Sequence, residues 1–277
     1  MKTYNVAVLG ATGAVGREML KVLEERNFPV GELRLLASAR SVGKKITFRG
    51  EEIAVMEANE NAFEGMDIVL GAATNELAKK LAPAIVKAGA VFVDNSSAFR
   101  MDPNVPLVVP EINPDDAMNH HGIVSNPNCS TIITLVAVNA INGLSPIKSM
   151  IASTYQAVSG AGIGGIYELE DQEKAIVSGG DITTETFPYQ IARNLIPQIG
   201  GFGDNLYTSE EMKMQNEGRK IMHLPELNVT CTCVRVPVMR SHSISVTLVT
   251  DRKITVEDRL MQLYEEEETI KAELDEK

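Results

Sequence analysis

Short apolar segments alternate with longer amphipathic segments through the first half of the chain. The longer segments repeat their apolar residues at helical spacing, as Met19, Leu20 and Leu23 do, and one of them is interrupted at Pro83. Strands that alternate with helices are typical of a doubly wound, Rossmann-type α/β fold with a parallel sheet. The predicted strands are residues 5–9, 33–37, 67–70, 91–94 and 123–125.

The pattern changes after residue 128. An apolar run over residues 132–141 predicts a helix, and a mixture of strands and helices follows it, which predicts an α+β domain. Residues 178–206 predict a long irregular connection, which is uncommon unless it is functional or packed against a partner. The sequence therefore divides into residues 1–128 and 129–277. The elements predicted for the second part are strands 149–156, 229–236 and 243–250 and helices 166–177, 209–218 and 253–274.

Two local signals refine these elements. Residues 45–55 predict a hairpin inserted into the first domain, because Arg49-Gly50 is a turn sequence between two strand-like segments. Ser209 is the predicted N-cap of the helix over residues 209–218, since its hydroxyl can accept a backbone N–H of the first turn.

A glycine-rich turn, Gly-Ala-Thr-Gly-Ala-Val-Gly, follows the first strand and opens the first helix. Glycines at such a turn let backbone N–H groups approach a pyrophosphate at the helix N-terminus. The spacing is a variant of the dinucleotide fingerprint, and an ordinary strand–helix turn is the alternative. The residues expected to hold the cofactor here are Gly10, Thr12, Gly13, Ala14, Val15 and Gly16.

The second strand ends in Ser38-Ala39-Arg40-Ser41 and carries no acidic residue at its tip. An acidic residue there would bind the ribose 2′-hydroxyl of NAD, whereas a guanidinium and hydroxyls suit the 2′-phosphate of NADP. We therefore expect Ser38, Arg40 and Ser41 to select NADP. The alternative is that they belong to a solvated loop.

Cys129 stands in Asn-Pro-Asn-Cys-Ser-Thr, immediately before the apolar helix of the second part. A cysteine at a helix N-terminus meets unpaired N–H groups and the positive end of the helix dipole, which favour the nucleophilic thiolate. A buried structural cysteine is the alternative.

Further along, alternation over residues 229–236 places Cys231 and Arg235 on one face of a strand, and His242 follows just beyond it. Histidine is the usual acid/base near neutral pH, so His242 is the candidate base among four histidines. Cys231 and Cys233 are too close for the common zinc spacing, and we expect no metal site.

Together these motifs make the chain similar to the aspartate-semialdehyde dehydrogenases, and the form of the cysteine motif differs from that of the sister N-acetyl-glutamyl-phosphate reductases. The resemblance implies that residues 1–128 bind NADP and that residues 129–277 form a catalytic and dimerisation domain, in a homodimer or homotetramer. The matching segments are residues 10–16, 95–100, 125–131, 156–162, 193–199 and 210–213, with Arg235 and His242.

The resemblance also implies the chemistry. Cys129 would attack L-aspartyl 4-phosphate, phosphate would leave, and NADPH would reduce the resulting thioester to L-aspartate 4-semialdehyde, a step in lysine, threonine and methionine biosynthesis. By the same resemblance, His242 transfers protons and Gln156 orients the intermediate. The implied binding residues are Arg235 for the α-carboxylate, Glu210 for the α-amino group, Arg100, Lys213 and Asn128 for the phosphoryl group, and Ser159 and Gly160 for the cofactor. An ordinary i,i+3 ion pair is the alternative for Glu210 and Lys213.

Composition narrows the classes of protein. A length of 277 residues with 44% hydrophobic and 23% charged residues is typical of a two-domain globular protein. The net charge of −11 argues against nucleic acid and anionic membrane as partners. We expect no membrane span or signal peptide, and a cytoplasmic location, because a catalytic thiol must stay reduced.

The sequence departs from the family pattern after the strand over residues 243–250. The resemblance implies a further segment that returns to the first domain and carries Asp-Asn-Leu-Arg-Lys-Gly, a motif that this sequence does not contain. A shortened relative that acts as a binding or regulatory subunit is therefore the alternative to an active enzyme.

Overall fold

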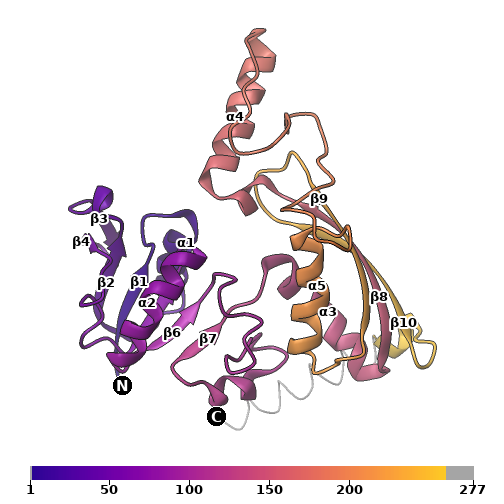
Figure 1. Cartoon of the computed structure of the whole chain (residues 1–277), viewed down its shortest axis with the longest axis horizontal. Coiled ribbons are helices and arrows are strands. Elements are labelled where there is room, and N and C mark those ends of the chain that lie inside the picture. Colours follow the sequence, from indigo (N-terminus) through magenta and orange to yellow (C-terminus); the bar gives the residue numbers. More distant parts are fainter. Residues whose placement is uncertain (1, 260–277) are drawn as a thin grey trace.

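The computed structural model describes residues 2–259 and contains two sheets (Figure 1). The first sheet has seven strands in the order β3-β4-β2-β1-β5-β6-β7 and is parallel except for the pair β3–β4. It confirms the predicted doubly wound α/β fold. Its elements are β1 (Tyr4–Leu9), α1 (Ala14–Glu25), β2 (Val30–Ala37), η1 (Ala39–Ser41), β3 (Lys45–Phe48), β4 (Glu51–Glu57), β5 (Ile68–Gly71), α2 (Asn75–Lys87), β6 (Val91–Asp94), η2 (Pro114–Asn119) and β7 (Ile123–Ser125).

Alternating residues of β1 serve opposite faces of this sheet. Val6 and Val8 pack with Leu20 of α1 on one face, whereas Ala7 and Leu9 pack on the other face with α2. Burial on both faces is expected of a parallel sheet, since helices cover both sides. The carboxyl ends of the strands therefore form the edge at which ligands bind in such folds.

Two predictions for this part have different outcomes. The hairpin over residues 45–55 is confirmed, with Phe48 paired to Glu51 across the turn. The predicted interruption at Pro83 is wrong, because α2 runs unbroken through it. Pro83 is exposed, so water can solvate the backbone carbonyl that its missing N–H leaves without a helical partner.

The second sheet has the order β10-β8-β9, with β8 parallel to β9 and antiparallel to β10. Helices α3 and α5 lie on one face, where Met150, Ala152 and Cys231 join the core. On the opposite face Ile151, Tyr155 and Val249 are exposed, and Figure 1 shows no helix of residues 2–259 covering them. The elements are α3 (Cys129–Leu144), β8 (Ile147–Gln156), η3 (Val158–Ala161), α4 (Ile163–Ser178), α5 (Ser209–Ile221), β9 (Asn228–Arg235) and β10 (Ser243–Thr250).

The start of α5 differs from the prediction by one residue. Thr208, not Ser209, is the N-cap, and its side chain accepts the N–H of Glu211 while the Glu211 carboxylate accepts the N–H of Thr208. This reciprocal capping box satisfies two N–H groups at once, which a cap at Ser209 would not allow with Glu211.

The irregular connection before α5 is held by two buried side chains of α4, which projects from the second sheet (Figure 1). Glu168 accepts the backbone N–H groups of residues 185, 186 and 187. Gln172 accepts those of Ile191 and Ala192. The segment is therefore irregular but fixed, and it places Phe187 in a small core with α4.

Most of the predicted helix over residues 253–274 lies outside the described residues, and only its first residues, up to 259, are seen. Within residues 2–259, no helix has both the length and the apolar character needed to cross a bilayer.

Candidate active site

Cys129 is the first residue of α3, and Asn128 caps that helix. The Asn128 Oδ1 accepts the N–H groups of Ser130 at 3.0 Å and Thr131 at 3.2 Å. The cap fixes the chain as it enters the helix, so Cys129 is presented at its very end. Its side chain is exposed, whereas Cys231 and Cys233 are buried in the second sheet with their sulfur atoms 3.6 Å apart.

His242 lies in the loop between β9 and β10, and its Nε2 is 3.2 Å from the Cys129 sulfur. Its Nδ1 accepts the N–H of Ala157 at 3.0 Å. A neutral imidazole whose Nδ1 accepts must carry its proton on Nε2, which assigns the tautomer that points N–H at the sulfur. Burial and the neighbouring Arg235 lower the pKa of His242, so the neutral ring is favoured.

The expectation that the helix N-terminus favours the thiolate needs a correction. Although Cys129 is accessible to solvent, the protein atoms packed around it desolvate the thiol and, followed by the negative charge of Glu210, raise its pKa. The N–H of Ser130 and the charge of Lys213 act in the opposite direction and are outweighed. Thiolate formation at this site therefore depends on which charges face Cys129 as well as on the helix end.

Glu210 of α5 is the hub that joins the polar side chains of the site. Its Oε1 accepts from Gln156 at 3.0 Å and from Asn128 at 2.9 Å, and its Oε2 pairs with Lys213 at 2.8 Å. Burial raises the pKa of Glu210, but Lys213 and the two amides outweigh it and hold this pKa below its usual value. Glu210 is therefore a carboxylate that its partners hold in place. Its role goes beyond the exposed i,i+3 ion pair with Lys213 that the spacing alone would suggest.

Arg235, the last residue of β9, is buried beside this hub. Its Nη1 donates to the carbonyl oxygen of Ala157 at 2.6 Å, and its guanidinium lies 5.9 Å from the centre of the Phe187 ring. A Cβ placed on Gly160 would come within 2.7 Å of the Arg235 Nη1 and 3.4 Å of the His242 ring. Gly160, which lies in η3 with Ser159, is therefore close to the side chains of Arg235 and His242.

Arg100 enters the site from the loop after β6. It donates to the carbonyl oxygens of Asn126 at 3.0 Å and Asn95 at 2.8 Å. Its third contact is an ion pair with Glu217 of α5 at 3.1 Å. Sequence reasoning missed Glu217, although its place seven residues after Glu210 puts both on one face of a helix.

The glycine-rich turn between β1 and α1 has the close approach that a dinucleotide cofactor requires. Gly10 has φ +91°, and a Cβ there would meet the Ala72 carbonyl oxygen at 2.3 Å. A Cβ on Gly16 would meet the Gly10 carbonyl oxygen at 2.3 Å. No larger residue fits at either position, so this turn fits a pyrophosphate at the N-terminus of α1. Thr12 and Gly13 of the turn and Ala14 and Val15 at the start of α1 complete it.

An ion pair connects the helix after the glycine-rich turn to the loop that carries His242. Arg240, two residues before His242, pairs with Glu18 of α1 at 2.9 Å. Ser38, Arg40 and Ser41 lie at the carboxyl end of β2, on the same edge of the sheet as the glycine-rich turn, and Arg40 is exposed.

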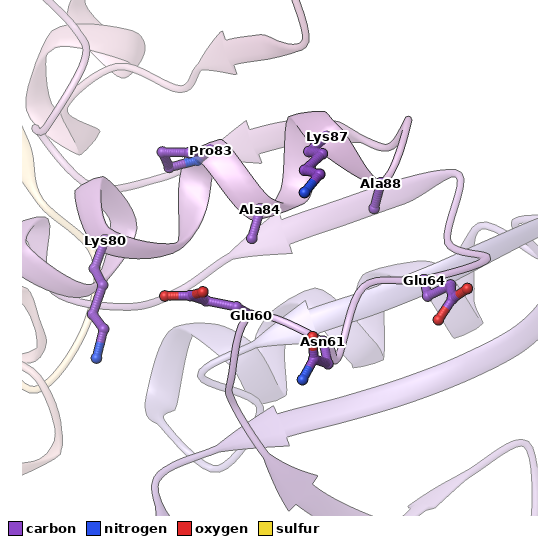
Figure 2. A pocket seen from close by; sticks show the side chains of 8 residues that line it. All are labelled: Glu60, Asn61, Glu64, Lys80, Pro83, Ala84, Lys87 and Ala88. Atoms are coloured by element: carbon purple, nitrogen blue, oxygen red, sulfur yellow. The ribbon is translucent and has the colours of Figure 1, made fainter.

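A groove of about 720 Å³ lies elsewhere, along α2. Figure 2 shows that its charged side chains, among them Glu64, Lys80 and Lys87, do not converge on one point. It contains none of the predicted site residues, so the candidate site remains the cluster around Cys129.

Comparisons with known proteins agree with this geometry. Residues 5–120 match the family model "Semialdehyde dehydrogenase, NAD binding domain", and residues 139–276 match "Semialdehyde dehydrogenase, dimerisation domain". The aspartate-semialdehyde dehydrogenase of Bacillus subtilis (strain 168) is 52% identical over 262 residues, which are 92% of this chain and 76% of that protein.

Solved structures give the same result. Aspartate semialdehyde dehydrogenase II from Vibrio cholerae, complexed with ASA, has a TM-score of 0.93 at 46% identity and covers 95% of this chain and 79% of its own. The enzyme from Candida albicans with NADP shares the fold, with a TM-score of 0.70 at 24% identity over 93% of this chain and 75% of its own. The chain therefore belongs to the aspartate-semialdehyde dehydrogenase family of oxidoreductases.

Proposed function

We propose that this protein catalyses the NADPH-dependent reductive dephosphorylation of L-aspartyl 4-phosphate to L-aspartate 4-semialdehyde, a step in lysine, threonine and methionine biosynthesis. The observation that carries the proposal is the contact of 3.2 Å between the Cys129 sulfur and His242 Nε2, next to the buried carboxylate of Glu210. A thiol, a histidine and an anchored carboxylate form a site for covalent catalysis on an acyl group.

The Cys129 thiolate attacks the acyl carbon of the substrate, the acyl–phosphate bond breaks, and phosphate leaves with the bonding electrons. The product is a thioester on Cys129, which accepts hydride more readily than a carboxylate does. NADPH, when bound, supplies the hydride that reduces this thioester. Collapse of the reduced adduct breaks the carbon–sulfur bond and releases the semialdehyde.

His242 transfers the protons in these steps. Its Nε2–H donates to the Cys129 sulfur and stabilises the thiolate, which offsets part of the cost of burial. Proton transfer through Nε2 requires a proton on Nδ1, so the bond from the Ala157 N–H must open during turnover. Gln156, fixed by Glu210, orients the intermediate.

The binding roles follow the charges of the site. Arg235 pairs with the substrate α-carboxylate, for which a planar guanidinium is well shaped, and Glu210 meets the α-amino group. Lys213 is partly exposed and holds the phosphoryl group together with Arg100 and Asn128. Arg100 uses three of its five N–H donors within the protein, which leaves two for phosphate.

The glycine-rich turn, with Gly10, Gly13 and Gly16, holds the cofactor pyrophosphate. Arg40 with Ser38 and Ser41 holds the 2′-phosphate, which makes NADP the cofactor. Gly160 lies beside Arg235 and His242, and together with Ser159 of the same short helix it would hold the cofactor. The Candida albicans relative with NADP uses the same fold.

The protein acts as a homodimer in the cytoplasm. The exposed face of the second sheet, which carries Ile151, Tyr155 and Val249, is the dimer surface. Its position within the segment that matches a dimerisation domain supports this assignment.

The test is NADPH formation when NADP, aspartate semialdehyde and phosphate are supplied together. We expect turnover that requires all three and that is lost in Cys129→Ala. Turnover without phosphate would contradict the acyl phosphate as substrate. Binding of NADP with no turnover would favour the alternative of a binding or regulatory subunit.

A further inference from the structure

Helix α5 carries four charged residues on one face. Glu210, Lys213, Glu217 and Lys220 follow one another at spacings of three, four and three residues, which align along a helix. Glu210 and Lys213 belong to the site around Cys129. Glu217 and Lys220 reach the first part of the chain and have no role in the proposed reaction so far.

Glu217 uses both of its carboxylate oxygens on residues of the site. Its Oε1 pairs with the Arg100 guanidinium at 3.1 Å, and its Oε2 accepts the backbone N–H of Asn128 at 2.7 Å. The side chain is almost fully buried, with 2% of the residue exposed. One carboxylate therefore ties the phosphate-binding guanidinium to the residue that precedes the nucleophile.

Lys220, one turn further along α5 than Glu217, holds the loop that carries Arg100. Its ammonium donates to the carbonyl oxygens of Arg100 at 2.8 Å, Asp102 at 2.7 Å and Val105 at 2.8 Å. An ammonium has three N–H donors, so all of them are used on this loop. Burial lowers the pKa of Lys220, as expected of an ammonium removed from water.

We propose that Glu217 and Lys220 are positioning residues, which fix Arg100 toward the leaving phosphate and, through Asn128, fix Cys129 toward the acyl carbon. The proposal rests on the proposed function and adds a requirement to it. Arg100 and Cys129 come from different parts of the chain, and Glu217 contacts the loops of both. Correct mutual placement of groups that act on one substrate is a large source of rate enhancement.

The substitution Glu217→Gln is the sharpest test. Glutamine keeps the shape and can still accept the Asn128 N–H, but its NH₂ group would face the N–H donors of Arg100. We expect the KM for phosphate, measured in the direction of semialdehyde oxidation, to rise about tenfold, as for one charge-assisted contact, and the KM for NADP to change less than about twofold. Lys220→Met should also raise the KM for phosphate. Lys148→Met, which removes an exposed ion pair with Asp251, is the matched control and should change neither constant.

A purely structural role would produce a different pattern. If Glu217 acts through Arg100, then Glu217→Gln should add little to the phosphate KM in an Arg100→Leu background, because interacting sites are not additive. An additive effect, or a lower melting temperature with an unchanged phosphate KM, would overturn the proposal.

Failure of the proposed function can be distinguished from failure of the positioning role. If the wild-type chain has no turnover, the proposed function fails, and phosphate affinity by calorimetry then decides the positioning role. Weaker phosphate binding by Glu217→Gln, by about tenfold, would still support it. Equal affinities of wild type and variant would overturn it.

Discussion

Cys129 differs from the other two cysteines by its surroundings. It is exposed at the end of α3 beside His242, whereas Cys231 is packed in the second sheet. Cys129→Ala should abolish turnover and leave NADP affinity unchanged, because the thiolate serves the chemistry and not the cofactor site. Cys231→Ala is the control and should keep most of the activity. Turnover and calorimetric NADP titration of both variants test this, and an active Cys129→Ala enzyme would exclude the thioester route.

The charge of Glu210 gives a prediction with a definite sign. Glu210 raises the pKa of Cys129, and Lys213 lowers it. Glu210→Gln should therefore shift the pH profile of Cys129 alkylation by iodoacetamide to lower pH, since removal of a negative charge favours the thiolate. Lys213→Met should shift it to higher pH. Mass spectrometry of the Cys129 peptide follows the reaction, and shifts in the reverse directions would show that these charges do not control the thiol.

We propose that cofactor choice depends on Arg40. It is exposed at the carboxyl end of β2, where residues 38–41 include no acidic residue. Arg40→Ala should weaken NADP binding by roughly tenfold and leave NAD binding nearly unchanged, because only NADP carries the 2′-phosphate. Calorimetry with both nucleotides measures the change, with Lys21→Ala on α1 as the control. Equal losses for NADP and NAD would place the 2′-phosphate elsewhere.

At the scale of elements, the second sheet is covered by helices on one face and exposes apolar side chains on the other. Tyr155→Asp, alone or with Ile151→Asp, should convert a dimer into a monomer, because a charge would be buried at the interface without a partner. Sedimentation velocity gives the oligomeric state. Val177→Asp makes the same change on α4, where Val177 is also exposed, and should leave the dimer intact. The opposite result would move the dimer surface to α4.

Local signals predicted most elements of this fold. Five strands of the first sheet, β1, β2, β5, β6 and β7, follow from short apolar segments, and the hairpin of β3 and β4 follows from its turn. The errors have local causes: exposure made Pro83 tolerable within α2, and the capping box selected Thr208 over Ser209. A single-residue signal is ambiguous where water or a neighbouring side chain can satisfy the backbone.

At the scale of the whole molecule, candidate site residues could be named only where they belonged to a recognisable motif. Cys129, Gln156 and His242 were proposed in this way, and the structure places Cys129 against His242 and Gln156 against Glu210. Glu217 was not found, because its partners Arg100 and Asn128 are 117 and 89 residues away in the sequence. Contacts at such separation are set by the packing of α5 against the first part of the chain, which periodicity does not encode.

The order of strands in the second sheet also governs how the chain can fold while it is being synthesised. The central strand β8 ends at Gln156, but both of its neighbours lie far downstream, β9 at Asn228–Arg235 and β10 at Ser243–Thr250. The two hydrogen-bonding edges of β8 therefore have no strand to pair with until most of the chain has left the ribosome, and such late, long-range pairing is slow and prone to aggregation. A nascent chain that stops before β9 would expose this strand to chaperones, and rapid synthesis of residues 157–228 would shorten that exposure.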